Sequence, residues 1–166
     1  DLGYEKGTDG MAEWMGHPYA PQYPANITTY LEHEIAVMWE VIRRLQQGEK
    51  LVIDTTGSVI YTGTQTLDRF RQMATLILLD APQDLQDELL VEYRATPKPR
   101  IWGDGTYAPL PGEDRDVALN RCFPDLLATR NARYHKLAHF VIDYRVLRQP
   151  GFTGQKLIEM CEASAI

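Results

Sequence analysis

The sequence lacks the features that mark several large classes of protein. Its two cysteines, Cys122 and Cys161, are far apart and match no zinc or redox spacing. No apolar run is long enough to cross a membrane. The net charge of −6 lacks the basic excess that is typical of nucleic-acid binding. These absences predict a single cytoplasmic domain over residues 1–166, with neither nucleic acid nor a membrane as a partner.

Catalytic motifs are equally scarce. No G-x-x-x-x-G-K-[ST] loop, which would cradle phosphates through its backbone N–H groups, occurs in the sequence. The four histidines form no set with metal-ligand spacing, and Thr56-Gly57-Ser58 does not match the G-x-S-x-G elbow of serine hydrolases. An unrelated α/β hydrolase or phosphatase is therefore the weakest interpretation, because no nucleophile stands out.

What the sequence does contain is an alternation of helical and buried-strand patterns. Apolar residues recur at helical spacing over 30–47, after a capping-box pattern of Thr29 and Glu32. Short apolar runs predict buried strands over 51–54, 74–79 and 140–143. Further helices are expected over 11–16, 64–73, 82–93, 115–121, 125–137 and 153–163. This alternation is typical of an α/β fold with a mostly parallel sheet.

Each of the three expected strands ends in an aspartate, namely Asp54, Asp80 or Asp143. Because parallel strands bring their carboxyl ends to one edge, the three carboxylates could line one rim, or each could simply cap the next element. Asp54 is the strongest candidate for binding Mg²⁺, because two hydroxyl residues and a glycine follow it. Gly57 would let a phosphate approach the backbone closely.

Arginines mark two further candidate sites. Arg94 and Arg100 stand at the entrance of a loop over 95–114 that is rich in proline and glycine. This loop could close over phosphates as a lid, or it could carry ordinary surface charge. Arg130 and Tyr134 are four residues apart and share a helix face, where the guanidinium could bind an anion bidentately or cover a packed tyrosine at the surface.

Taken in order along the chain, these segments resemble the shikimate kinases, a branch of the P-loop small-molecule kinases. The resemblance is carried by Asp1 with Glu5, Tyr30 to Glu34, Val52 to Val59, Ile77 to Asp80, the 95–114 loop, Arg130 to Tyr134, and Phe140 to Asp143 with Pro150. It implies a three-layer P-loop-kinase-like fold that transfers phosphate from ATP, with Mg²⁺, to the hydroxyl of a small molecule.

The resemblance also implies roles on the nucleotide side. Asp54 would organise Mg²⁺, and Arg94 and Pro150 would flank the adenine of ATP. Arg100 would act on the transferring phosphate from the lid. Such an enzyme needs positioning and charge stabilisation more than covalent chemistry from its side chains.

On the substrate side, the chain departs from the family. By resemblance Asp1 and Arg130 would hold the substrate, but Leu31 stands where the family has a second arginine for the substrate carboxylate. The family's triple glycine is represented by Thr55, Thr56 and Gly57. The expected substrate is therefore a hydroxyl-bearing small molecule other than shikimate.

The largest departure from the family is the absence of the first strand and of the loop that would hold the phosphates. Asp1 aligns just after the family's second strand. We therefore expect this chain to lack roughly the first 30 residues of the family's fold, judging by the size of a βαβ unit, and its sheet to lack the first, central strand. The strands at 51–54 and 74–79 would then pair directly, or a second copy would cover the gap in a homodimer. We expect a nucleotide-dependent small-molecule kinase that is inactive as this chain; the alternative is a kinase-like binding or regulatory module.

Overall fold

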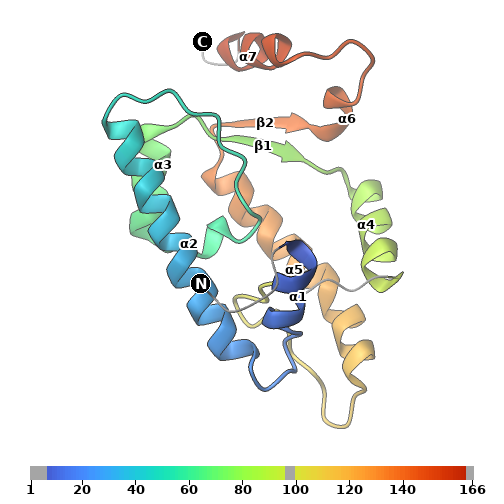
Figure 1. The fold of residues 1–166 in the computed structure, drawn as a ribbon. Coiled ribbons are helices and arrows are strands. Elements are labelled where there is room, and N and C mark those ends of the chain that lie inside the picture. The colour runs from blue at the N-terminus through green and yellow to red at the C-terminus, as the bar shows by residue number, and fades with distance from the viewer. Residues whose placement is uncertain (1–6, 96–99, 164–166) are drawn as a thin grey trace.

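The computed structural model describes residues 7–95 and 100–163 as a mixed α/β structure in which helices predominate (Figure 1). The strands are β1 (Ile77–Asp80) and β2 (Phe140–Asp143). The helices are α1 (Thr8–Met15), α2 (Tyr23–Gln46), the short 3-10 helix η1 (Val59–Tyr61), α3 (Thr64–Met73), α4 (Gln83–Ala95), α5 (Arg115–Leu137), α6 (Tyr144–Leu147) and α7 (Gly154–Ala163).

The two strands form a parallel pair, as the alternation of elements predicts. Ile77 lies beside Phe140, and the register continues to Asp80 beside Asp143. The chain passes from β1 to β2 through α4 and α5, which is the long crossover that parallel strands require. β1 begins later than the expected range of 74–79 and includes the aspartate that follows it.

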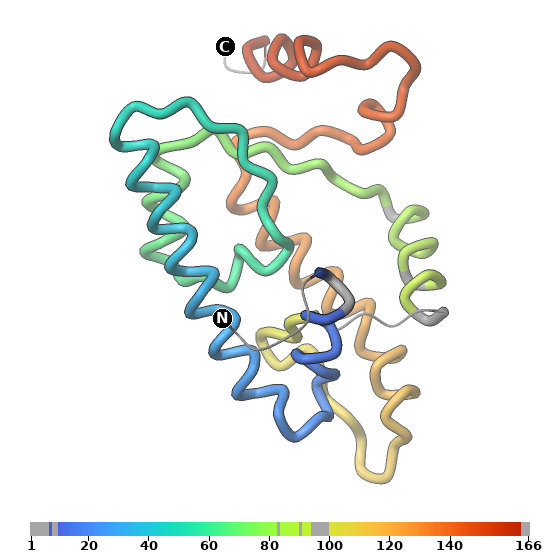
Figure 2. Tube along the Cα trace, viewed as in Figure 1, coloured from blue at the N-terminus to red at the C-terminus, as the bar shows by residue number. Residues whose placement is uncertain are grey.

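The expected strand at 51–54 is wrong. This segment leaves the end of α2 and runs without strand pairing to η1, a path that can be followed in Figure 2. Val52 is fully exposed. A strand exists only where a neighbour accepts and donates its backbone hydrogen bonds, and among the described residues β1 pairs with β2 alone. The anticipated direct pairing of 51–54 with β1 is therefore wrong as well.

Helix α2 begins earlier than its capping-box pattern indicates. It starts at Tyr23, and Pro24 occupies its first turn, where a missing N–H group costs little. Thr29 lies inside the helix, where its hydroxyl donates to the Ala25 carbonyl at 3.1 Å. The expected cap at Thr29 is wrong because proline, which fixes a helical φ, starts the helix upstream.

Residues 115–137 form one helix rather than the expected two. Pro124 lies inside α5, where it removes one backbone hydrogen bond. The cost of an interior proline, about 3 kcal/mol in an exposed helix, is offset here by extensive burial. The buried hydrophobic residues of α5 are Ala118, Leu119, Cys122, Phe123 and Leu126.

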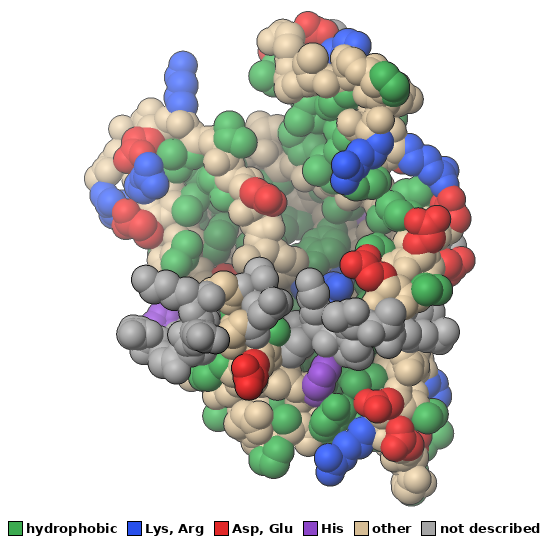
Figure 3. Space-filling view, turned by 45° about the vertical axis from the view of Figure 1, so that its right-hand side comes forward, with side chains coloured by type: hydrophobic (Ala, Val, Ile, Leu, Met, Phe, Trp, Pro, Cys, Tyr) green, Lys and Arg blue, Asp and Glu red, His purple; other side chains and the backbone are tan. Residues whose placement is uncertain are grey.

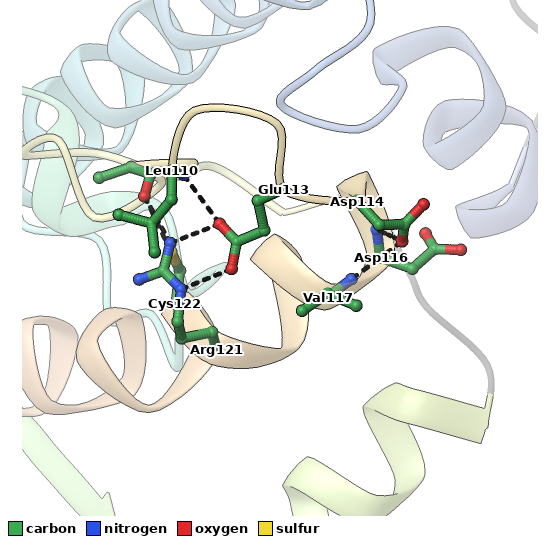
Figure 4. A network of polar contacts seen from close by, with 8 residues as sticks. Leu110, Glu113, Asp114, Asp116, Val117, Arg121 and Cys122 are labelled. Atoms are coloured by element: carbon green, nitrogen blue, oxygen red, sulfur yellow. Dashed lines mark hydrogen bonds and ion pairs between the residues drawn. The ribbon is translucent and has the colours of Figure 1, made fainter.

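Polar contacts fix the start of α5 (Figure 4). The Asp114 carboxylate accepts from the backbone N–H groups of Asp116 at 2.9 Å and Val117 at 3.2 Å, which satisfies two donors at the helix end. Arg121 donates to both carboxylate oxygens of Glu113, at 2.7 and 2.8 Å. The turn before α5 is thereby tied to the helix, which sets the position of the residues further along it.

The core consists of two clusters of buried residues. One gathers α1, the start of α2, α4 and the first half of α5, with Phe123 fully buried in it. The other gathers the second half of α2, η1 and α3, with Ile42 fully buried. Tyr61 packs against both clusters, and Tyr134 packs against the second. The second half of α5 therefore lies where the two clusters meet.

Candidate anion-binding site

Arg130 and Tyr134 of α5 hold the turn that precedes η1. Arg130 is 7% exposed, and its Nη2 donates to the Gly57 carbonyl. The Tyr134 hydroxyl donates to the same carbonyl at 2.6 Å. The two residues share a helix face as their spacing predicts, while the alternative of a surface arginine is wrong because Arg130 is buried.

Arg100 reaches the same region from the segment between α4 and α5. Its guanidinium carbon lies 5.6 Å from the ring centroids of both Tyr93 and Phe123. Its backbone carbonyl accepts from the Tyr23 hydroxyl at 2.7 Å. Burial lowers the pKa of Arg100, and the positive charge of Arg130 lowers it further.

Neither guanidinium forms an ion pair with a carboxylate in the part of the chain that the structure describes. The Nε atoms of Arg100 and Arg130 are both buried without a hydrogen-bond partner. By contrast, the more exposed Arg133 pairs with Asp104 at 2.5 Å. Burying part of a guanidinium without a carboxylate partner is costly, so each of these two arginines is a candidate for binding an anion. Figure 3 shows a hollow on one face of the molecule, lined by hydrophobic side chains, with Lys or Arg atoms at its border.

A carboxylate and two hydroxyl groups form the other side of this site. Glu34 of α2 accepts from the Ser58 hydroxyl at 3.0 Å and from the Thr56 hydroxyl through the same oxygen, Oε1. The Thr56 and Ser58 hydroxyls lie 2.9 Å apart. The Tyr30 hydroxyl oxygen lies 3.4 Å from Ser58 Oγ. The second oxygen of Glu34, Oε2, is buried and has no partner.

Tyr134 lies between the basic and acidic sides of the site. Burial raises the pKa of its hydroxyl; the charges of Arg130 and Arg100 lower it, and the charge of Glu34 raises it. The site thus has Arg130 and the half-buried Tyr134 on the Gly57 carbonyl, and Glu34 with its two hydroxyl partners on the residues that flank this glycine.

The structure brings together three of the residues singled out in the sequence. Thr56, Gly57 and Arg130 meet at the turn before η1, where Glu34 binds Thr56 and Arg130 binds the Gly57 carbonyl. Arg100 lies against Tyr93 and Phe123. A side chain at position 57 would collide with Arg130, because a Cβ at Gly57 would lie 2.9 Å from Nη2 of Arg130. The sequence-based interpretation of Arg130 as an anion-binding residue is compatible with this geometry and stays a prediction.

Other predicted site residues lie elsewhere. Asp54 and Thr55 are exposed in the segment that forms no strand. Pro150, in the turn between α6 and α7, lines a hollow of about 380 Å³ that shares no lining residue with the anion site. Asp1 falls outside the described residues, and the structure describes the backbone of Arg94 within α4 but not its side chain.

Two of the three strand-end aspartates share one edge, which is one of the two possibilities that the sequence left open. Asp80 and Asp143 are register partners. Asp143 also accepts from the backbone N–H of Arg145 at 2.7 Å, so the capping alternative is correct for this residue. Asp54 is not at that edge, because its segment is not part of the sheet. Within the described ranges, no group of three or more His, Cys, Asp or Glu side chains is placed to hold a metal.

The sequence analysis missed Glu34 as a site residue. Its position in the sequence indicated a buried environment, because Glu34 lies four and eight residues before Met38 and Ile42, which are both buried. An acidic residue in line with a buried helix stripe requires a polar partner. Ser58, which is 6% exposed, carried no comparable signal because its partners come from a distant helix.

No helix among the described residues is both long and apolar enough to cross a membrane. Comparisons with protein families, with curated proteins and with solved structures found no match for this chain. The case for a function therefore rests on the geometry of the site.

Proposed function

We propose that this chain belongs to a nucleotide-dependent small-molecule kinase resembling the shikimate kinases, which transfers a phosphoryl group from ATP to a hydroxyl. The observation that carries the proposal is that Arg100 and Arg130 each have a buried Nε atom without a hydrogen-bond partner and form no ion pair with a carboxylate among the described residues. Phosphoryl transfer depends on positioning and on stabilising negative charge, and preorganised arginines in a dry site supply both.

The two arginines come from different elements and would act on different groups. Arg130 sits on α5 against the Gly57 carbonyl, and it would bind the anionic group of the substrate. Arg100 precedes the segment that leads into α5, and it would neutralise charge on the transferring phosphate. Asp54 would organise Mg²⁺, and Arg94 and Pro150 would contact the adenine of ATP.

The sheet supports a larger kinase-like architecture. Two-stranded parallel sheets are rarely stable by themselves, because parallel sheets normally have several strands and helices on both faces. β1 has an unpaired edge among the described residues, and the apolar segment over 51–54 belongs to no helix or strand. We propose that one further strand pairs with this edge, in a three-layer fold with a mostly parallel sheet.

The test is a phosphotransferase assay on two proteins. Purified residues 1–166 are expected to show no ATP turnover, because their sequence contains no phosphate-binding loop. The coding sequence upstream of Asp1 is then read, and any strand and G-x-x-x-x-G-K-[ST] loop encoded there are included in a longer protein. That protein is expected to consume ATP with a hydroxyl-bearing acceptor, and Arg100→Met is expected to lower kcat by about 10²-fold or more.

A matched control is Arg133→Met. Arg133 is already paired with Asp104, so its substitution should leave kcat unchanged. ATP turnover by residues 1–166 above contaminant controls would show that phosphate transfer does not need the loop. Equal kcat for the Arg100 and Arg133 variants would exclude Arg100 from the chemistry.

The alternative is a kinase-like binding or regulatory module without catalysis. It is favoured by the position of Asp54, which is exposed and lies outside the sheet, where it is not held for metal binding. A start codon directly before Asp1, together with ligand binding but no turnover, would support the module.

A further inference from the structure

His139 joins the start of β2 to the residue that precedes β1. Its backbone N–H donates to the Leu76 carbonyl at 2.8 Å, and the next N–H, that of Phe140, donates to the same carbonyl at 3.1 Å. The side chain completes the contact, because its Nδ1 atom accepts from the Leu76 backbone N–H at 3.0 Å. An imidazole ring therefore takes the place that a backbone carbonyl would have at this end of the sheet.

The hydrogen bond from Leu76 determines the protonation state of the ring. A ring nitrogen accepts a hydrogen bond only when it carries no proton, so His139 is neutral here, with its proton on Nε2. In the charged imidazolium both nitrogens carry protons, and Nδ1 would then point a donor at the Leu76 N–H. Because His139 is exposed, protons from the solvent reach the ring directly.

The surroundings of His139 oppose a positive charge on the ring. Arg71, from the last turn of α3, donates through Nε to the last carbonyl of α5 at 3.0 Å, which places its guanidinium at the same junction. Partial burial lowers the pKa of His139, and the charge of Arg71 lowers it further. Lys136 of α5, which is exposed, lies three residues before His139. A second histidine of α5, His135, instead has its Nε2 atom 3.4 Å from Oδ1 of Asp80, at the far end of β1.

We propose that His139 is a pH-sensitive clasp between β1 and β2, which the neutral ring closes and a proton opens. The clasp lies one turn beyond Tyr134, whose carbonyl accepts from the N–H group of Ala138 at 2.9 Å. It thus links the sheet to the half of α5 that carries Arg130 and Tyr134.

The direction of the pH dependence follows from the lowered pKa. In the folded chain the pKa of His139 lies below its ordinary value of 6.5, so the unfolded chain binds the proton more readily. The stability that the clasp contributes is therefore complete above pH 6.5 and is lost as pH falls through the lowered pKa.

The experiment is NMR spectroscopy of the full 166-residue chain between about pH 5 and 8. Imidazole nitrogen shifts report the tautomer, and they should show the proton of His139 on Nε2 at the upper end of this range. The titration midpoint of the ring should lie below 6.5. Amide hydrogen exchange then compares the Leu76 N–H with that of Ile42, which is fully buried in α2. Losing one net hydrogen bond should lower the relative protection of Leu76 about 3- to 10-fold across the midpoint.

His139→Asn is the decisive variant, because an asparagine side-chain oxygen can accept from the Leu76 N–H but does not titrate in this range. The protection of Leu76 in this variant should stay constant over the pH range in which that of the wild type falls. His33→Asn, an exposed change on α2, is the matched control and should respond to pH as the wild type does.

Four results would overturn the proposal. Two are read from the wild type alone, namely a proton on Nδ1 of His139 at about pH 8 and a midpoint at or above 6.5. The third is a relative protection of Leu76 that stays constant across the midpoint in the wild type. The fourth is a fall in His139→Asn that equals that of the wild type. The first three need no substitution, so the proposal stays testable if the asparagine variant does not fold.

Discussion

Replacing Arg130 with methionine should separate binding from stability. Arg130 contributes one hydrogen bond to the Gly57 carbonyl, but the Tyr134 hydroxyl donates to the same carbonyl at 2.6 Å. The carbonyl therefore stays satisfied after the substitution. Methionine is similar in length and apolar, so it can fill the space among the surrounding side chains.

The expected size of each effect follows from these contacts. Losing a net hydrogen bond costs about 1 kcal/mol, while removing a buried guanidinium that has no carboxylate partner among the described residues returns a similar or larger amount. We therefore expect the free energy of unfolding to stay within about 1 kcal/mol of the wild type, or to rise. Anion binding loses a charge-assisted hydrogen bond of about 1.5–3 kcal/mol, so the Kd for hexanoate or pyrophosphate should rise about 10- to 150-fold.

The assay combines urea denaturation with calorimetric titration at pH 7. Arg133→Met is the matched control, because Arg133 pairs with Asp104 at 2.5 Å and donates to the Ile60 carbonyl at 3.2 Å. It should leave anion affinity unchanged and lower stability by about 1 kcal/mol or less. If Arg130→Met destabilises the fold by several kcal/mol, or if its anion affinity equals that of the wild type, Arg130 is a structural residue and the reasoning fails.

Four further predictions test the fold and the site. Asp114→Ala should lower the free energy of unfolding in urea by about 1 kcal/mol, because it removes the N-cap of α5. Gly57→Ala should weaken anion binding in the same titrations, since its Cβ would lie 2.9 Å from Nη2 of Arg130, and an unchanged Kd would contradict this placement. Burial raises the pKa of Tyr93 to about 12, so the free energy of unfolding that its neutral hydroxyl contributes is complete below pH 10 and is lost as pH rises towards 12. Urea midpoints of the wild type should therefore fall more between pH 10 and 12 than those of Tyr93→Phe. Finally, we propose that in purified residues 1–166 a second copy covers the β1 edge that the further strand would occupy in a longer protein. Sedimentation velocity should then show a dimer that Leu79→Lys dissociates, and a monomer at all concentrations would refute it.

Local sequence patterns were sufficient for elements that depend on near neighbours. The apolar run at Phe140–Asp143 forms β2, and α3 begins and ends where the pattern over 64–73 predicts. The spacing of Arg130 and Tyr134 placed both on one face, because positions four apart on a helix always lie together. Helix boundaries were less predictable where proline intervened, as at Pro124, since packing decided whether the helix continued.

Elements that depend on distant partners were not predictable in this way. The run over 51–54 has the composition of a buried strand, yet no described strand lies beside it to complete its hydrogen bonds. Glu34 is a mid-helix acid in the sequence, and only the fold places it against Thr56 and Ser58. Neither outcome is encoded in a local window, because both require residues more than 20 positions away.

The sequence by itself determined where most helices form, that the sheet is parallel, and which arginine shares a face with a tyrosine. These follow from periodicity and from the long crossover between strands, which are local or topological properties. Only the tertiary structure decided that Arg130 reaches the Gly57 carbonyl, and that Glu34 binds the hydroxyls of the two flanking residues with its second oxygen buried and unpartnered. The physical reason is that the cost of an unpaired buried charge depends on which distant segments exclude water from it, and the fold alone sets that arrangement.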